Sequence, residues 1–412
     1  MKNPEDVGLS SERLARVRPA LAKYVVDDKV AGIVAVIARR GQIVYEECLG
    51  LMDRENQTAM RPDAIFRIYS MTKPIVCVAL MTLYEQGLFQ LNLPVATFIP
   101  AFNSLKVYAG EDEAGEMVLE DLQRPVTIRD LLTHTSGLTY HWLEYGRVEF
   151  LYREAHLLTN KPLAEFVDDL LQLPLAFQPG TAWRYSNAHD VVARLVEVIS
   201  GRPLDDYLQE TIFDPLGMVD SGYYVPEAKP DRFATMYGSY EVLQSDMTFT
   251  RWFGEAMMGV SRYLAGPTDS LESAPHQTLR GGHGLVSTAA DYLRFAQMLL
   301  NGGELDGRRI LGRKTLELMT TNHLRPELLP YELGGVPSPG LGYGLGFRVL
   351  MDLGQSQTVG SVGEFGWGGA ASTNFWVDPE EELIGVLMSQ YQPPVHLLIP
   401  DFKVMAYQAI VD

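Results

Sequence analysis

The sequence has little cysteine and no long hydrophobic run. Its two cysteines, Cys48 and Cys77, stand outside any Cys-x-x-Cys motif in a chain of 412 residues. A disulfide framework or a zinc knuckle is therefore disfavoured, and two free thiols are typical of a protein in a reducing cytosol. The longest apolar stretches, such as residues 30–38, are too short to cross a bilayer, and residues 1–17 lack the apolar core of a signal peptide. We therefore expect a cytoplasmic protein with no membrane partner.

Positive charge is also scarce. The chain has 34 Lys and Arg against 52 Asp and Glu, a net charge of −18, and no block of basic residues. This balance repels the phosphates of nucleic acids and anionic lipids, so we expect neither as a partner. The 46% hydrophobic and 21% charged residues are typical of a globular protein, and the length suggests two or three domains.

The pattern of the two chain ends differs from that of the middle. Near each end, β-rich runs separated by short turns predict hairpins, whereas the middle predicts helices. This arrangement predicts one mixed sheet built from both ends, with a mostly helical domain inserted between them. The expected strands are 32–38, 43–49, 372–377 and 383–389, and the expected helices are 10–28 (bent at Pro19), 126–134, 163–171, 187–200, 203–212 and 395 to the end. Long loops are expected at 101–124, with a solvated acidic run at 111–113, and at 219–275.

A serine and a lysine lie three residues apart at the predicted start of a helix. Ser70 and Lys73 share one face of that helix, so the amine can approach the hydroxyl. A serine hydroxyl needs a base to become a nucleophile, and a lysine can serve in that role. The helix N-terminus favours developing negative charge. The alternative is that Ser70 caps the helix and Lys73 is a solvated surface residue.

A tyrosine and an asparagine form the Tyr-x-Asn motif of the chain, just before the helix predicted from residue 187. Tyr185 beside a lysine ammonium can shuttle a proton, because the cation stabilises the phenolate. Asn187 offers an amide that could orient a substrate or hold Lys73. The alternative is that Tyr185 packs in a core and Asn187 caps the helix.

A glycine-rich segment, residues 366–371, precedes the strand predicted at 372–377. Glycines at a strand edge let a ligand approach the backbone, and a free N–H there could complete an oxyanion hole with the N–H of Ser70. A turn around a structural tryptophan is the alternative. A phosphate-binding loop is disfavoured, because its Gly-Lys-Ser/Thr and Gly-x-Gly-x-x-Gly patterns are missing.

These three elements, in this order, resemble the serine β-lactamase and penicillin-binding protein superfamily, which has Ser-x-x-Lys, then Tyr-x-Asn, then Lys/His/Trp-x-Gly on a strand. The segments 126–138, 178–187, 201–218 and 282–303 support the resemblance, which spans nearly the whole chain. The sequence is most similar to the class C β-lactamase-like esterases called family VIII carboxylesterases. The resemblance implies an α/β (α+β) fold with an antiparallel sheet flanked by helices, in which residues 1–90 and 285–412 form the sheet domain and residues 91–284 the helical one.

The resemblance also implies roles for the motif residues. Ser70 is then the acylated nucleophile, with Lys73 and Tyr185 as the general base and acid in an order that stays open. Asn187 is then a substrate- or lysine-contacting residue, and Trp367 is an apolar wall where β-lactamases usually have a cation.

The backbone near the glycine-rich segment has an implied role as well. Gly368 and Gly369 line the substrate site, and the N–H of Ala370 joins that of Ser70 in the oxyanion hole. The expected activity is hydrolysis of carboxylic esters with short acyl chains, without a metal or organic cofactor. A β-lactamase or D-alanyl peptidase, an acyltransferase with the same acyl-enzyme, and a non-catalytic binding protein stay as alternatives, and the oligomeric state is left open.

Other patterns along the chain are less specific. No serine has the Gly-x-Ser-x-Gly pattern of an α/β-hydrolase. The histidines at 134, 141, 156 and 189 lack metal-like spacing, so turn or surface roles are expected, and His283 could line the cleft. The aromatic and methionine side chains between 236 and 264, among them Tyr237, Tyr240, Phe249, Trp252, Phe253 and Tyr263, predict either a substrate wall or the packing of a long loop.

Overall fold

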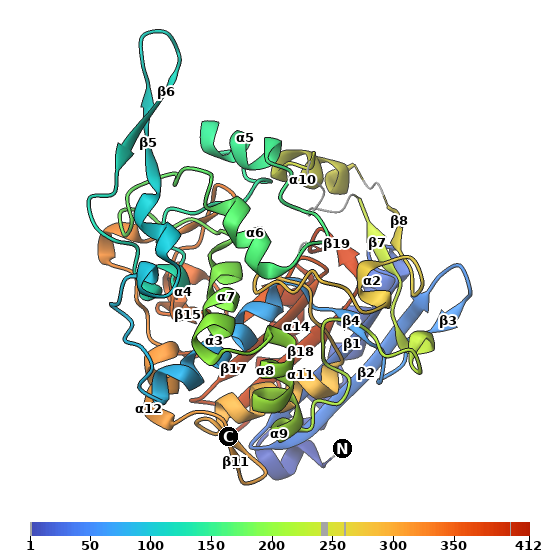
Figure 1. The fold of residues 1–412 in the computed structure, drawn as a ribbon. Coiled ribbons are helices and arrows are strands. Elements are labelled where there is room, and N and C mark those ends of the chain that lie inside the picture. The colour runs from blue at the N-terminus through green and yellow to red at the C-terminus, as the bar shows by residue number, and fades with distance from the viewer. Residues whose placement is uncertain (1, 240–245, 259–260, 396) are drawn as a thin grey trace.

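One eight-stranded antiparallel sheet, built from both ends of the chain, runs through the molecule (Figure 1). The structure is a computed structural model that describes residues 2–239, 246–258, 261–395 and 397–412. Strand β1 joins the two ends, because it pairs with β2 on one side and with β18 on the other. In spatial order the strands are β14 (Leu341–Tyr343), β15 (Arg348–Leu350), β16 (Phe365–Gly369), β17 (Thr373–Asp378), β18 (Leu383–Met388), β1 (Gly32–Arg39), β2 (Gln42–Asp53) and β3 (Thr58–Ala59).

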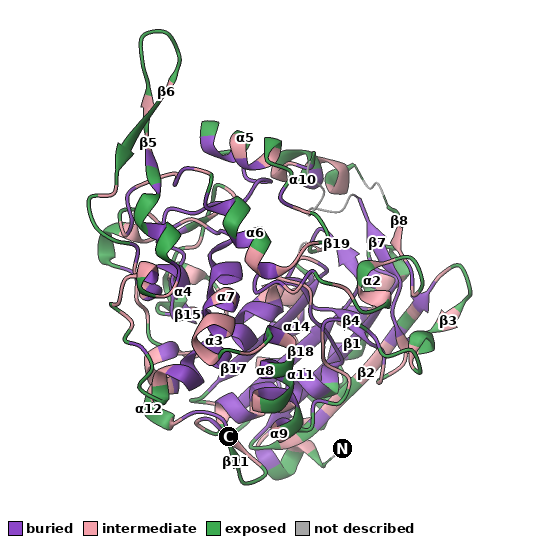
Figure 2. Cartoon of the chain, viewed as in Figure 1, coloured by how far each residue is buried: buried purple, intermediate pink, exposed green. Residues whose placement is uncertain are grey.

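Strand β1 is buried along its whole length (Figure 2). Its alternate side chains enter two different cores. Val34 and Val36 face the larger core, where α3 (Thr72–Glu85) and α11 (Ala289–Leu300) pack. Ile33 and Ala35 face the smaller core, formed with α2 (Val17–Val26) and α14 (Leu398–Tyr407). Helices therefore cover both faces of the sheet.

Helices from the middle of the chain pack on the outer side of α3. Helix α4 begins at a capping box made by Thr127 and Asp130, and α7 ends at Gly201 in the left-handed conformation. The larger core continues from the sheet into these helices, and the proposed division into two domains stays a prediction. The helices are α4 (Ile128–Leu132), α5 (Arg147–Glu154), α6 (Leu163–Leu170), α7 (Ala188–Ser200), α8 (Leu204–Leu208), which continues as a π-helical turn (Gln209–Phe213), and α9 (Asp214–Leu216).

Two expectations, one about the first helix and one about a loop, are wrong. The first helix is broken before Val17 rather than bent at Pro19, which lies in the first turn of α2, where a missing N–H costs no intrahelical hydrogen bond. Residues 101–124 contain a projecting hairpin, β5 (Lys106–Glu111) and β6 (Met117–Asp121), with the acidic run at its tip (Figure 1). Its side chains are mostly exposed, so the alternation that marks a half-buried strand is weak.

The segment expected as a long loop at 219–275 also holds regular structure. Strand β7 (Met236–Gly238) pairs with β8 (Arg262–Ala265) and with β19 (Tyr391–Gln392), and α10 (Phe249–Met257) lies between β7 and β8 in sequence. The remaining elements are α1 (Ser11–Leu14), β4 (Phe66–Arg67), β9 (Val286–Ser287), β10 (Glu304–Leu305), β11 (Arg308–Arg309), α12 (Arg313–Met319), β12 (Glu332–Leu333), β13 (Val336–Pro337) and α13 (Leu353–Ser356), together with short 3-10 turns.

No helix in the described part of the chain is long and apolar enough to span a membrane. Cys48 and Cys77 are both free thiols.

Candidate active site

Ser70 and Lys73 lie where a short 3-10 turn, Tyr69–Met71, runs into α3. Tyr69 adopts a left-handed conformation with φ 44°, which turns the chain sharply before Ser70. Lys73 is 1% exposed on an almost wholly buried helix. Its Nζ donates to Ser70 Oγ at 3.1 Å and to the carbonyl of Gly282 at 2.6 Å. Lys73 is therefore a buried partner of Ser70 and not a solvated surface residue.

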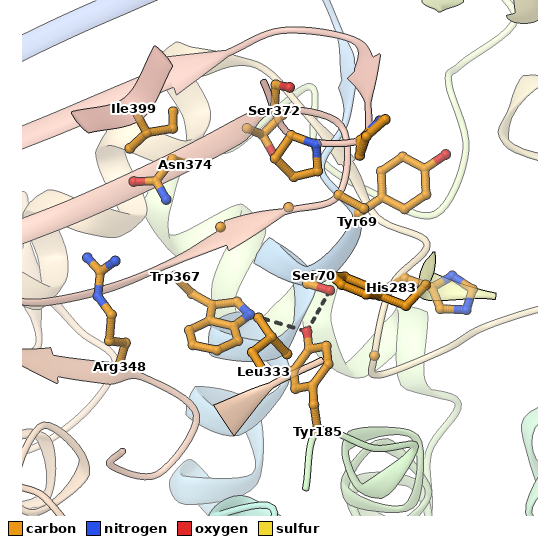
Figure 3. A pocket seen from close by; sticks show the side chains of 18 of the residues that line it. Tyr69, Ser70, Tyr185, His283, Leu333, Arg348, Trp367, Ser372, Asn374 and Ile399 are labelled. Atoms are coloured by element: carbon orange, nitrogen blue, oxygen red, sulfur yellow. Dashed lines mark hydrogen bonds between the residues drawn. The ribbon is translucent and has the colours of Figure 1, made fainter. Parts of the chain in front are cut away.

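Tyr185 reaches the same oxygen from the other side. It precedes α7, and its hydroxyl donates to Ser70 Oγ at 2.7 Å (Figure 3). The face of its ring lies 4.5 Å from Lys73 Nζ, a distance at which a cation is attracted to the ring. The three residues predicted to be catalytic thus meet at Ser70 Oγ.

Trp367 approaches Tyr185 from strand β16. Its indole Nε1 donates to the Tyr185 hydroxyl oxygen at 3.3 Å, so the side chain supplies a hydrogen bond as well as an apolar wall (Figure 3). The segment that was expected to precede a strand is itself a strand, and Trp367 faces Phe375 across the ladder with β17. Glycines have low strand propensity, and here pairing with β17 outweighs it.

The end of β16 fits closely against the segment that leads to Ser70. A Cβ on Gly369 would lie 2.4 Å from the carbonyl oxygen of Ile68, so this close approach requires glycine. Gly368, Gly369 and Ala370 all line the same pocket as Ser70. The backbone after Trp367 therefore lies in the wall of the pocket that Ser70 enters.

Asn187 lies in a different position from the one expected. Its side chain is 4% exposed, and Nδ2 donates to Asp190 Oδ2 at 3.2 Å. It occupies the N-cap of α7 without a side-chain capping hydrogen bond, and it is not among the described residues that line the pocket. The printed hydrogen bond of its side chain is therefore to Asp190, and its contact with a substrate stays a prediction.

The pocket over Ser70 has a volume of about 470 Å³ and mostly apolar walls. Phe249, Trp252 and Phe253 of α10 line it, which supports a substrate wall in that segment, whereas Tyr237 packs in the smaller core and Tyr240 lies outside the described residues. His283 lines the pocket, and burial lowers the pKa of its imidazole to about 4, which leaves it neutral at pH 7. Sequence reasoning missed Tyr140, Trp142, Leu333, Arg348 and Asn374, which also line it.

Two histidines expected in turns or on the surface are fully buried behind Tyr185. The rings of His134 and His189 lie 4.3 Å apart, and His134 lies 4.8 Å from the ring of Tyr185. Burial lowers the pKa of both well below the usual value, so both are neutral packing partners. No three metal-ligating side chains cluster among the residues with described positions.

Comparison with known proteins gives the family. The beta-lactamase family model matches residues 16–409. The chain belongs to the beta-lactamase family. It is 31% identical to esterase EstB of Burkholderia gladioli, over 88% of this chain and 87% of EstB. It is 29% identical to a lovastatin esterase of Penicillium rubens, over 88% and 89% of the two chains.

A solved structure agrees with this family assignment. EstCE1, described as a hydrolase with promiscuous acyltransferase activity, superposes with a TM-score of 0.76 at 26% identity and covers 96% of this chain and 99% of its own. The beta-lactamase-like fold predicted from the sequence, with an antiparallel sheet and flanking helices, is thereby confirmed. The chain has the fold of a beta-lactamase-family enzyme with esterase relatives.

Proposed function

We propose that the protein hydrolyses carboxylic esters through an acyl-enzyme on Ser70, in the manner of a family VIII carboxylesterase. The observation that carries this proposal is the convergence of Lys73 Nζ and the Tyr185 hydroxyl on Ser70 Oγ, at 3.1 and 2.7 Å. Two proton-transfer groups on one hydroxyl are what an activated serine requires. The intact set speaks against a non-catalytic binding protein.

The reaction proceeds in two steps, acylation of Ser70 and hydrolysis of the acyl-enzyme. Ser70 Oγ attacks the ester carbonyl carbon while its proton passes to the Lys73 and Tyr185 pair. The oxyanion is stabilised by the backbone N–H groups of Ser70 and Ala370. The bond to the alcohol breaks, and the alcohol leaves with the proton from the pair. Water then attacks the acyl-enzyme, gives its proton to the same pair, and releases the acid and Ser70.

The acyl group is expected to be short and apolar. The aromatic walls from Trp142, Phe249 and Phe253 favour an apolar group, and the resemblance to family VIII carboxylesterases favours a short one. No metal or organic cofactor takes part in these steps, and a small-molecule ester in the cytoplasm is the expected substrate.

Transfer of the acyl group to another alcohol is the second candidate, because it uses the same acyl-enzyme. EstCE1 is described as having such a transfer activity, and apolar walls beside Ser70 would favour an alcohol over water. A β-lactamase or D-alanyl peptidase is less favoured, because Trp367 supplies no cation for a substrate carboxylate, although weak β-lactamase activity is compatible with the site.

The test is a rate comparison across substrates and variants. p-Nitrophenyl esters of increasing acyl length are assayed beside a chromogenic cephalosporin, with wild type, Ser70→Ala and Tyr185→Phe. We expect ester turnover to exceed cephalosporin turnover and Ser70→Ala to abolish it. Ser200→Ala, which removes a hydroxyl at the far end of α7, is the matched control and should keep wild-type rates. Full ester turnover by Ser70→Ala contradicts the mechanism, cephalosporin turnover far above ester turnover favours the β-lactamase, and a transesterified product with added butanol identifies acyl transfer.

A further inference from the structure

A line of hydrogen bonds connects α7 to Lys73 through the backbone of Gly282. Asn187 Nδ2 donates to Asp190 Oδ2 at 3.2 Å, and the N–H of Gly282 donates to Asp190 Oδ1 at 3.0 Å. The carbonyl oxygen of Gly282 then accepts from Lys73 Nζ at 2.6 Å. Asp190 is 0% exposed and, like Asn187, is not among the described residues lining the pocket over Ser70, so it has no direct path to a substrate there.

Glycines 281 and 282 let this segment press against α7. A Cβ on Gly281 would lie 1.9 Å from the carbonyl oxygen of His189, and one on Gly282 would lie 2.7 Å from the hydroxyl oxygen of Tyr140. Neither neighbour leaves room for a side chain. The fit fixes the Gly282 N–H against Asp190 and the Gly282 carbonyl against Lys73.

The carboxylate of Asp190 lies at one end of this line of hydrogen bonds, and Lys73 lies at the other. A buried carboxylate is costly unless hydrogen bonds and an opposite charge stabilise it. Asp190 makes no ion pair with any residue of described position, so the hydrogen bonds from Gly282 and Asn187 are its contacts. The Gly282 N–H and the Gly282 carbonyl belong to two successive peptide groups, so Asp190 acts on Lys73 by fixing the Gly282 backbone and by its charge through space. The fixed carbonyl orients the Lys73 amine, and the negative charge attracts the ammonium.

We propose that Asp190 is a positioning residue of this site: through the Gly282 backbone it holds Lys73 beside Ser70, and its buried charge stabilises the lysine's positive charge. Asn187 orients Asp190 by occupying Oδ2, which leaves Oδ1 for Gly282. This proposal rests on the proposed role of Ser70 as the nucleophile. It gives Asn187 a function that needs no substrate contact.

The other groups around Lys73 do not replace this charge. Tyr140 and Tyr185 present ring faces to Nζ, and burial and the nearby Asp190 raise the pKa of the Tyr140 phenol well above its usual value. Burial also raises the pKa of the Cys77 thiol on the same helix. Arg280 is a further buried cation, and Glu272 acts on His283 from farther away. The three histidines that sense the charge of Lys73 are kept neutral at pH 7 by burial: His134, His189 and His283.

The test measures the reactivity of Ser70 against pH in Asp190→Asn. A fluorophosphonate labels an activated serine without requiring a particular ester: the Oγ–P bond forms, fluoride leaves with the P–F electron pair, and the hydroxyl proton passes to the Lys73 and Tyr185 pair. The amide oxygen that this substitution introduces can still accept from the Gly282 N–H but carries no charge. We expect the limb of the pH–rate profile that Lys73 controls to move to lower pH by about one unit, a tenfold effect at a fixed pH on that limb.

A buried aspartate elsewhere provides the control. Asp291 of α11 also accepts a backbone N–H, that of Asp220 at 2.7 Å, and it is distant in sequence and contacts from Lys73. Asp291→Asn should leave the profile unchanged. Asn187→Ala, which frees Asp190 Oδ2, should shift the same limb in the same direction by a smaller amount and serves if Asp190→Asn does not fold.

The outcomes separate this proposal from the proposed function. A profile of Asp190→Asn, or of Asn187→Ala in its place, that superimposes on that of wild type overturns the role of Asp190, and so does an equal shift in Asp291→Asn. If wild type is labelled at Ser70 and Asp190→Asn shows the shift, but wild type cleaves no ester, the ester hydrolase is overturned while the role of Asp190 stands.

Discussion

Removal of the Tyr185 hydroxyl should affect both rate and stability, because the oxygen takes part in two hydrogen bonds. It donates to Ser70 Oγ at 2.7 Å and accepts from Trp367 Nε1 at 3.3 Å. Tyr185→Phe keeps the ring, which is packed among other aromatic side chains and only 6% exposed. The change therefore removes one polar atom from the site with little loss of packing.

The expected losses follow from these two contacts. Loss of a positioned acid–base group typically lowers the rate by about 10²–10⁴-fold. The indole N–H of Trp367, which is 7% exposed, is left without an acceptor, and an unsatisfied buried donor costs about 1–3 kcal/mol. We expect the free energy of unfolding to fall by about that amount.

A double-mutant cycle separates the two effects. kcat/KM with p-nitrophenyl butyrate and urea unfolding are measured for wild type, Tyr185→Phe, Trp367→Phe and the double variant. The double variant lacks both the hydroxyl and the indole N–H, so no donor is left unsatisfied. The sum of the stability losses of the two single variants should therefore exceed the loss of the double variant by about 1 kcal/mol. Activity should stay low, because the acid–base group is still missing. Tyr185→Phe with more than half of wild-type kcat/KM would refute the acid–base role, and additive stability losses would refute the hydrogen bond from Trp367.

Three further predictions concern the pocket wall, a thiol and an ion pair. Phe249→Ala should lower kcat/KM about tenfold for hexanoate esters and little for acetate esters, because Phe249 is part of the apolar pocket wall that a longer acyl chain contacts; assays across acyl lengths check this. Cys77 should resist maleimide in the folded protein at pH 7 and react after denaturation, because burial raises the pKa of its thiol, and mass spectrometry detects the adduct. Burial raises the pKa of Asp220, but hydrogen bonds and charge from Arg232 and Lys229 outweigh it and hold that pKa below its usual 3.8. Asp220→Asn should therefore lower the free energy of unfolding by about 1–3 kcal/mol at pH 7. The difference between the variant and wild type should shrink as pH falls below 3.8. Urea unfolding of both proteins at pH 7 and below pH 3.8 checks this.

Local signals in the sequence predicted the parts of the site that lie close together along the chain. Ser70 and Lys73 are three positions apart, and helix periodicity alone places them on one face. The capping box at Thr127 and the glycine at 201 are local signals of the same kind, because each acts within a single helical turn. The order of motifs then indicated the family.

Contacts made by backbone groups and by distant segments left no such signal. The carbonyl that binds Lys73 belongs to Gly282, 209 residues away, and any residue type has a carbonyl. The sequence showed Trp367 as an apolar wall, because nothing local indicates where its indole N–H points. Strand β16 was missed since its glycines have low strand propensity and only pairing with β17 stabilises it.

The contacts around the Tyr185 and Lys73 pair favour one direction of proton transfer. Both groups donate a hydrogen bond to Ser70 Oγ, so one of them must lose its proton before it can accept the proton of Ser70. The indole N–H of Trp367 stabilises negative charge on the Tyr185 oxygen, and the Gly282 carbonyl stabilises positive charge on Lys73. Both contacts favour the phenolate–ammonium pair, with Tyr185 as the first base. In that case Lys73 must stay protonated during turnover, so Asp190→Asn should shift the alkaline limb of the kcat/KM profile. A shift confined to the acidic limb would instead identify neutral Lys73 as the first base.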